Sequence, residues 1–85
     1  MNRKYLDELI NVLMIESNRG EKELEIFLRG ILTPSELEQL AKRLQIVKKL
    51  KLGENQRQIA TDLEVGIATV TRGSREIEKG RFKYV

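Results

Sequence analysis

Apolar residues recur every three or four positions along most of the chain, which is the spacing of one face of an α-helix. The pattern predicts a first helix that stops near residues 18–20 and a second that ends near Gly30. Their apolar positions are Leu6, Leu9, Ile10, Leu13 and Met14, then Leu24, Phe27, Leu28 and Ile31. Apolar and polar residues do not alternate with period two for more than a few positions, so the pattern predicts an all-α fold.

A capping sequence marks the start of a third helix. Thr33 is a suitable N-cap, Pro34 occupies the first helical position, and Glu36 completes a capping box. We expect this helix to stop at Gly53. Its predicted apolar face consists of Leu37, Leu40, Leu44, Val47 and Leu50.

Two shorter helices are predicted at residues 55–63 and 67–79, on either side of a break at residues 64–66. Asn55 is the expected N-cap of the first, and Gly80 ends the second. Their apolar positions are Ile59, Leu63, Val65, Val70 and Ile77, with the small Ala60 where the helices would cross. So short a pair cannot bury its own apolar faces and must pack on the preceding helices, as a helix-turn-helix does. Glu64 stands where many such motifs have glycine.

Size and composition exclude several classes of protein. A chain of 85 residues forms one small domain that is marginally stable without a partner. The absence of cysteine and histidine excludes disulfides, thiolate metal sites and histidine catalysis, and no converging acid–base pair can be placed, so we expect neither an enzyme nor a metal site. No apolar run approaches the ~18 residues of a membrane span, and no signal-peptide core is recognisable. We therefore expect a soluble, cytoplasmic oligomer without a membrane partner.

The net charge of +3 conceals an asymmetry along the chain. Residues 1–40 carry five Lys and Arg against eight Asp and Glu, a net charge of −3, whereas residues 41–85 carry eleven against five, a net charge of +6. A basic half is expected of a surface that contacts phosphates, although a solvated basic surface would have the same composition.

The basic half contains the candidate DNA-contacting residues. The second short helix starts with short side chains, which suit a helix that approaches base edges in the major groove. Polar side chains and backbone N–H groups at the start of the first short helix can hold phosphates. The predicted contacts to DNA are Gln56, Arg57, Val65, Gly66, Ile67, Ala68, Thr69 and Thr71. The alternative is an ordinary helical hairpin.

Three sequence features resemble the Trp repressor family: Leu32-Thr33-Pro34, Arg43 within a long helix, and the string GIATVTRGS at residues 66–74. The resemblance extends from about residue 24 to residue 79. It implies an intertwined homodimer of short helices that represses transcription by binding a palindromic operator, with L-tryptophan as corepressor. In this organisation residues 1–54 form the N-terminal helices and dimerisation core, residues 55–80 the helix-turn-helix, and residues 81–85 a C-terminal tail.

The resemblance also implies a tryptophan site. Arg43 and Arg72 would stack on the two indole faces, Arg72 would grip the carboxylate, and Thr33, next to Leu32, would add a hydrogen bond. Gly73 would leave room for the ring, since glycine within a helix costs about 1 kcal/mol and indicates a close fit. Without the resemblance, Thr33 is an N-cap, Arg43 an exposed helix arginine, and Arg72 a phosphate contact.

Departures from the family pattern keep two other functions open. Ala60 and Glu78 replace basic residues that the family uses near DNA, and Glu76 replaces a small polar residue near the ligand. The given chain ends at Val85, before most of the last helix that family members pack into the dimer. One alternative is a DNA-binding regulator that does not respond to tryptophan. The other is a helical protein-interaction module with no role at DNA.

Overall fold

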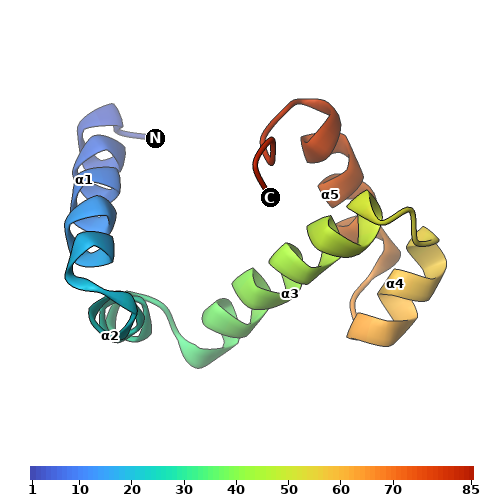
Figure 1. Ribbon diagram of the computed structural model, residues 1–85, viewed down its shortest axis with the longest axis horizontal. Coiled ribbons are helices and arrows are strands. Elements are labelled where there is room, and N and C mark those ends of the chain that lie inside the picture. The colour runs from blue at the N-terminus through green and yellow to red at the C-terminus, as the bar shows by residue number, and fades with distance from the viewer. The chain divides into compact units, whose positions relative to one another are not determined.

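The computed structural model describes residues 1–85 and is entirely helical (Figure 1), as predicted. Its elements are α1 (Arg3–Arg19), α2 (Glu21–Ile31), α3 (Pro34–Lys51), α4 (Gln56–Leu63) and α5 (Ile67–Glu78). None of these helices combines the length and apolar character needed to cross a bilayer. The chain divides into two compact units, Met1–Leu37 and Glu38–Val85.

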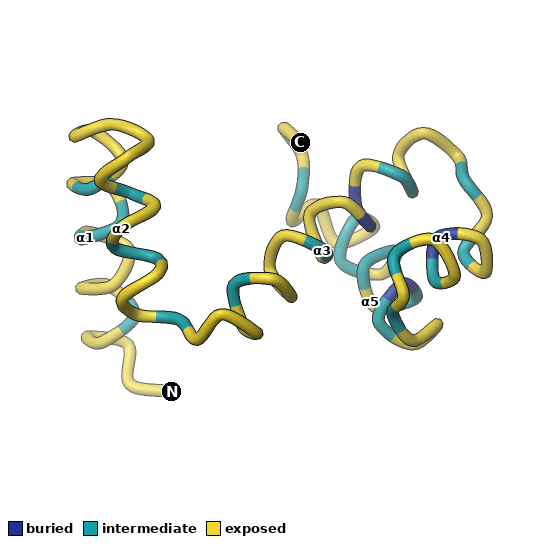
Figure 2. Tube along the Cα trace, turned by 90° about the horizontal axis from the view of Figure 1, so that it is seen from below, coloured by how far each residue is buried: buried dark blue, intermediate teal, exposed yellow.

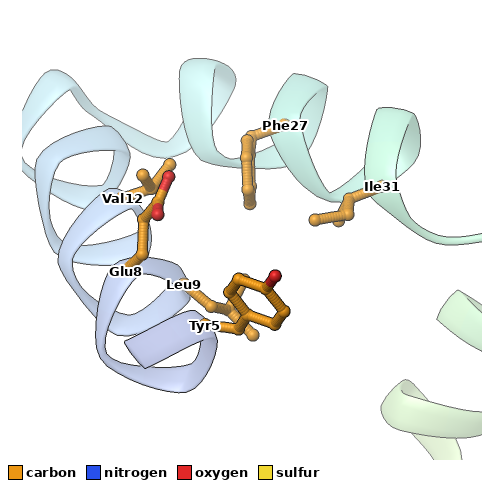
Figure 3. Close-up of a pocket in the computed structure, with 6 residues that line it drawn as sticks. All are labelled: Tyr5, Glu8, Leu9, Val12, Phe27 and Ile31. Atoms are coloured by element: carbon orange, nitrogen blue, oxygen red, sulfur yellow. The ribbon is translucent and has the colours of Figure 1, made fainter. Parts of the chain in front are cut away.

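The first unit pairs α1 with α2 but encloses no core of its own. The two helices meet at Gly20, whose φ of 117° lies in the region that favours glycine. No residue of α1 or α2 is buried, and Figure 2 shows buried positions only in α3, α4 and α5. This unit contains an open hollow of about 430 Å³, and Figure 3 shows the side chains around it. It is lined by Tyr5, Glu8, Leu9, Val12, Phe27 and Ile31.

The predicted capping box opens α3. The backbone N–H of Thr33 donates to Oε1 of Glu36 at 2.8 Å, and the N–H of Glu36 donates to Oγ1 of Thr33 at 3.1 Å. These bonds satisfy donors that a helix start leaves free. Hydrogen bonding from Thr33 also lowers the pKa of Glu36 below its ordinary value of 4.5.

The second unit packs the end of α3 against α4 and α5. Its buried residues are Ile46, Val47, Ile59 and Val70. Leu50, Ala60, Leu63 and Val65 are partly buried against this core. The predicted face of the third helix was therefore wrong in part, because it omitted Ile46 and included two exposed leucines. Leu40 and Leu44 are 45% and 46% exposed, since α4 and α5 cover only the C-terminal half of α3.

Replacing Ile59 with alanine should strongly destabilise the protein. Ile59 is completely buried, and removing such a side chain costs about 2–5 kcal/mol through lost apolar contact and the cavity left behind. Urea unfolding at one fixed protein concentration measures the change. Ile67→Ala is the matched control, because Ile67 is 47% exposed and should unfold at nearly the wild-type midpoint. Equal losses in both variants would contradict the described core.

The stabilising effect of Glu36 should disappear in acid. Because its pKa is lowered on folding, the ionised carboxylate contributes stability above pH 4.5, and this contribution is lost as the pH falls through the folded-state pKa. The difference in unfolding free energy between wild type and Glu36→Gln should therefore shrink as the solution is acidified. Glu38→Gln is the control, because Glu38 makes only a 3.7 Å ion pair with Lys42. A difference that does not change with pH would exclude the ionised cap.

Candidate functional site

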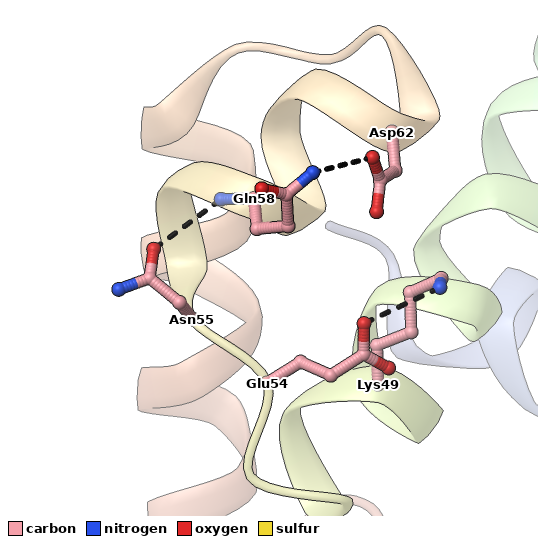
Figure 4. A network of polar contacts seen from close by, with 5 residues as sticks. All are labelled: Lys49, Glu54, Asn55, Gln58 and Asp62. Carbon is pink, nitrogen blue, oxygen red and sulfur yellow. Dashed lines mark hydrogen bonds and ion pairs between the residues drawn. The ribbon is translucent and has the colours of Figure 1, made fainter.

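The helix-turn-helix begins at a polar cap. Oδ1 of Asn55 accepts hydrogen bonds from the backbone N–H groups of Arg57 at 2.8 Å and Gln58 at 3.3 Å, which confirms Asn55 as the N-cap of α4. Figure 4 shows this cap beside the bond from Gln58 to Asp62 and the Lys49–Glu54 ion pair. These contacts fix how the chain enters α4 after α3.

Glu64 makes the turn between α4 and α5. Its φ and ψ of 54° and 49° are left-handed, a conformation that costs a side-chain-bearing residue roughly 1 kcal/mol or more. Its N–H donates to the carbonyl groups of Ala60 and Thr61, which ends α4. Glu64 thus takes the conformation that glycine usually supplies in this motif. Gly66 does not, because its φ is −69°.

The first turn of α5 is open to solvent. Ile67 and Ala68 are exposed, and Thr69 is half-buried. Gly66 provides no side-chain cap, and a Cβ atom built there would meet nothing within 4 Å. The residues at this end of the helix are therefore exposed, although the N–H of Thr69 donates to the carbonyl of Gly66 at 3.1 Å.

Gln56 and Thr71 join the two helices of the motif. Oγ1 of Thr71 donates to Oε1 of Gln56 at 2.9 Å, and both side chains are half-buried. Val65, another predicted DNA contact, is partly buried against the apolar core. These three residues have structural contacts within the chain, whereas Arg57, Ile67 and Ala68 are exposed.

Several arginines of the second unit have no acidic partner. Arg57, Arg72 and Arg75 take part in none of the ion pairs of the chain. Unpaired guanidinium groups remain available for phosphates or carboxylates.

A small cavity lies between α3 and α5, next to the open end of α5. It has a volume of about 50 Å³, enough for a few water molecules. Its lining comprises Arg43, Ile46, Val47, Thr69, Arg72, Gly73, Glu76 and Phe82. A wider hollow of about 310 Å³ shares Arg43, Ile46 and Thr69 with it. The structure thus brings together three of the predicted ligand residues, Arg43, Arg72 and Gly73.

Gly73 allows α5 to approach α3 closely. A Cβ atom at this position would lie 3.0 Å from Cγ2 of Ile46 and 3.6 Å from Cδ1 of Leu50. The first distance is shorter than ordinary van der Waals contact, so a larger residue would require Ile46 to shift by a few tenths of an ångström. The close fit predicted for this glycine is therefore present, but it is made with Ile46 of the same chain.

Glu76 places a negative charge at the cavity. Its carboxylate pairs with Lys79 at 3.1 Å and with Arg81 at 3.3 Å. The hydrogen bond from Lys79, aided by Arg81 and by the charge of Arg72, lowers the pKa of Glu76 against the opposing effect of burial. Glu76 is therefore ionised at neutral pH.

Two predicted ligand residues lie elsewhere in the chain. Leu32 and Thr33 belong to the first unit and are not among the residues that line the cavity, so their contact with a ligand stays a prediction. Conversely, Ile46, Val47 and Phe82 line the cavity without having been predicted. Of these three residues, only Val47 belongs to the apolar face that the sequence predicted for the third helix.

The comparisons with known proteins agree on one family. The family model described as Trp repressor protein matches residues 4–85. The Trp operon repressor homolog of Vibrio vulnificus is 41% identical over 76 residues, which cover 88% of this chain and 74% of that protein. The homolog of Vibrio campbellii is 42% identical over 76 residues, covering 88% and 76%. That of Vibrio cholerae is 48% identical over 59 residues, covering 68% and 57%.

The family match confirms the resemblance seen in residues 66–74 and accounts for the geometry of α4 and α5. It also confirms the expectation of a regulator that is not an enzyme, because members of this family regulate transcription. With a family model matched over almost the whole chain and about two residues in five shared with curated relatives, the protein belongs to the Trp repressor family.

Proposed function

We propose that this protein is a sequence-specific repressor that binds a palindromic DNA operator as an intertwined homodimer when L-tryptophan occupies the cavity behind α5. The relatives are named Trp operon repressor homologs, which supports this assignment. Because the proposed partner is operator DNA, the protein would act in the cytoplasm.

The observation that carries the proposal is the position of Thr69. Thr69 belongs to the open first turn of α5 and also lines the cavity that contains Arg43 and Arg72. A ligand in this cavity would therefore touch the helix that meets DNA. Because binding free energies are coupled in both directions, the ligand would raise operator affinity and the operator would raise ligand affinity.

DNA recognition is proposed for the exposed first turn of α5. Ile67 and Ala68 reach solvent, and their apolar side chains suit contact with thymine methyl groups in the major groove. The accessible backbone at Gly66 and the free guanidinium of Arg57 suit phosphate contacts. The Gln56–Thr71 hydrogen bond would hold both helices in register on the duplex.

Tryptophan recognition is proposed for the two arginines. Arg72 offers a planar pair of donors for the ligand carboxylate, and the guanidinium planes of Arg72 and Arg43 can stack on an indole ring. The apolar wall formed by Ile46 and Val47 would contact the ring edge. Gly73 lines the cavity without a side chain that would narrow it. The absence of a side chain also allows its close contact with Ile46.

Dimerisation is proposed because too little apolar surface is covered within one chain. Four residues are buried, and the first unit contributes none of them. A second copy would cover the exposed apolar side chains. They include Leu9, Ile10, Met14, Ile15, Ile26, Ile31, Leu40 and Leu44.

A regulator that does not respond to tryptophan is the second candidate. It is favoured by the cavity volume of about 50 Å³, which is too small for an indole ring as the cavity stands. The two candidates share the DNA-contacting helix and differ only in the ligand.

The deciding experiment measures binding to a palindromic Trp-type operator with and without L-tryptophan. Wild type should bind more tightly with the ligand, whereas Arg72→Ala should lose roughly 10- to 100-fold in tryptophan affinity, as expected for a charged hydrogen bond. Because the chain contains no tryptophan, all indole fluorescence comes from the ligand, and the change in its anisotropy on adding protein measures binding.

The matched control is Arg75→Ala, one turn further along α5, where the arginine does not line the cavity. It should keep the tryptophan response. Operator binding that ignores tryptophan would establish the second candidate. Absence of sequence-specific binding under both conditions would reject a DNA-binding role and leave a protein-interaction module.

Replacing Ala68 with leucine should reduce operator discrimination. Ala68 is exposed, so the larger side chain leaves the fold intact, and leucine is a good helix former. At a base edge it should lower operator affinity by about ten-fold, the cost of roughly one mismatched base pair. Affinity for unrelated DNA of equal length and the thermal midpoint should stay unchanged. Equal loss on both DNA molecules would contradict base contact by α5.

A further inference from the structure

The chain reverses direction at the end of α5 (Figure 1). Gly80 has a φ of 79°, and its N–H donates to the carbonyl of Ile77 at 2.9 Å. The N–H of Arg81 donates to the carbonyl of Glu76 at 3.1 Å. This pair of bonds is a Schellman motif, in which glycine turns the chain back towards the helix it has just left.

Side chains hold the returning segment, residues 81–85, at two places. Arg81 pairs with Glu76 on α5 at 3.3 Å. Lys51, in the last turn of α3, donates hydrogen bonds to the backbone carbonyls of Phe82 and, at 2.9 Å, Val85. The segment is therefore fastened to both helices that form the cavity.

Phe82 follows Arg81 in this segment, and its side chain lines the cavity. It is half-buried, while its neighbours Arg81 and Lys83 are exposed. It shares the cavity with Arg43, Arg72 and Gly73, and about 50 Å³ remains unoccupied. An aromatic side chain is thus part of the wall of the cavity that the two arginines also line.

We propose that Phe82 is a built-in occupant of the ligand cavity, which an aromatic ligand must displace before it can bind. The inference rests on the proposed tryptophan function and adds its regulation. Phe82 lines the same cavity as Ile46 and Val47, the apolar wall that an indole ring would contact. Arg72 and Gly73 line the smaller cavity and not the wider hollow beside it. The unoccupied volume of the smaller cavity does not admit an indole ring beside Phe82, so a ligand that reaches Arg72 requires residues 81–85 to release Phe82.

If Phe82 must leave the cavity first, the protein binds the ligand more weakly than it would with an open cavity. When only a fraction of molecules has an open cavity, the apparent affinity is reduced by that fraction. Contacts that fasten residues 81–85, above all those of Lys51, therefore set the tryptophan concentration at which the protein responds. Loosening them should raise affinity without changing any atom that touches the ligand.

The test compares tryptophan binding by wild type, Phe82→Ala and Lys51→Ala in the full chain. Both variants should bind tryptophan about three- to ten-fold more tightly, because the open fraction rises. Lys48→Ala is the matched control, since Lys48 also lies in the last turn of α3 and carries the same charge but makes no bond to residues 81–85. Weaker binding in both variants would overturn the inference and make Phe82 part of the ligand-binding wall.

A second measurement detects the surroundings of the Phe82 ring and does not depend on ligand binding. The chain has two phenylalanines, so fluorophenylalanine labelling gives two fluorine NMR signals, with Phe27 as the internal reference. Lys51→Ala should move the Phe82 signal towards that of the free amino acid, and Lys48→Ala should not. Saturating tryptophan should shift the wild-type signal in the same direction.

The two sets of results distinguish a failure of the proposed displacement of Phe82 from a failure of the proposed tryptophan function. If neither wild type nor Phe82→Ala binds tryptophan, the proposed ligand is wrong, whereas the response of Phe82 to Lys51→Ala still tests its place in the cavity. If tryptophan binds while the Phe82 signal stays unchanged, displacement is excluded and the proposed function stands.

Discussion

The close packing of α5 on α3 at Gly73 is the contact on which the second unit depends. Ile46 lies against Gly73 and is also buried with Ile59 and Val70, so one apolar cluster fixes α3, α4 and α5 together. The first turn of α5 can then remain exposed while later turns line a cavity. Both features therefore lie on one helix held by one cluster, which is the arrangement that the proposed coupling between ligand and operator requires.

Local signals in the sequence predicted the helices well. Helix starts at Thr33 and Asn55 follow from side chains that satisfy free N–H groups, and the structure confirms both. Gly53 and Gly80 likewise sit where α3 and α5 end. Such features depend on a few neighbouring residues, which is why the helix boundaries and the helix-turn-helix could be predicted without knowledge of the tertiary structure.

Features that depend on distant contacts were harder to predict. Ile46 and Leu44 look alike in the sequence, yet one is buried and the other exposed, because only the end of α3 is covered. Gly73 suggested a ligand but is first explained by Ile46. The backbone carbonyl of Phe82 accepts a hydrogen bond from Lys51, which is far away in the sequence, so no periodicity in the last residues could reveal this contact.

The charges around the cavity favour an anionic group on whatever occupies it. Glu76 already has Lys79 and Arg81 as partners, so its negative charge is largely offset. Arg43 and Arg72 take part in none of the ion pairs of the chain. Phe82 lines the cavity with these arginines but carries no charge with which to pair them. A ligand with a carboxylate could pair with a guanidinium group, an interaction that the phenyl ring cannot make.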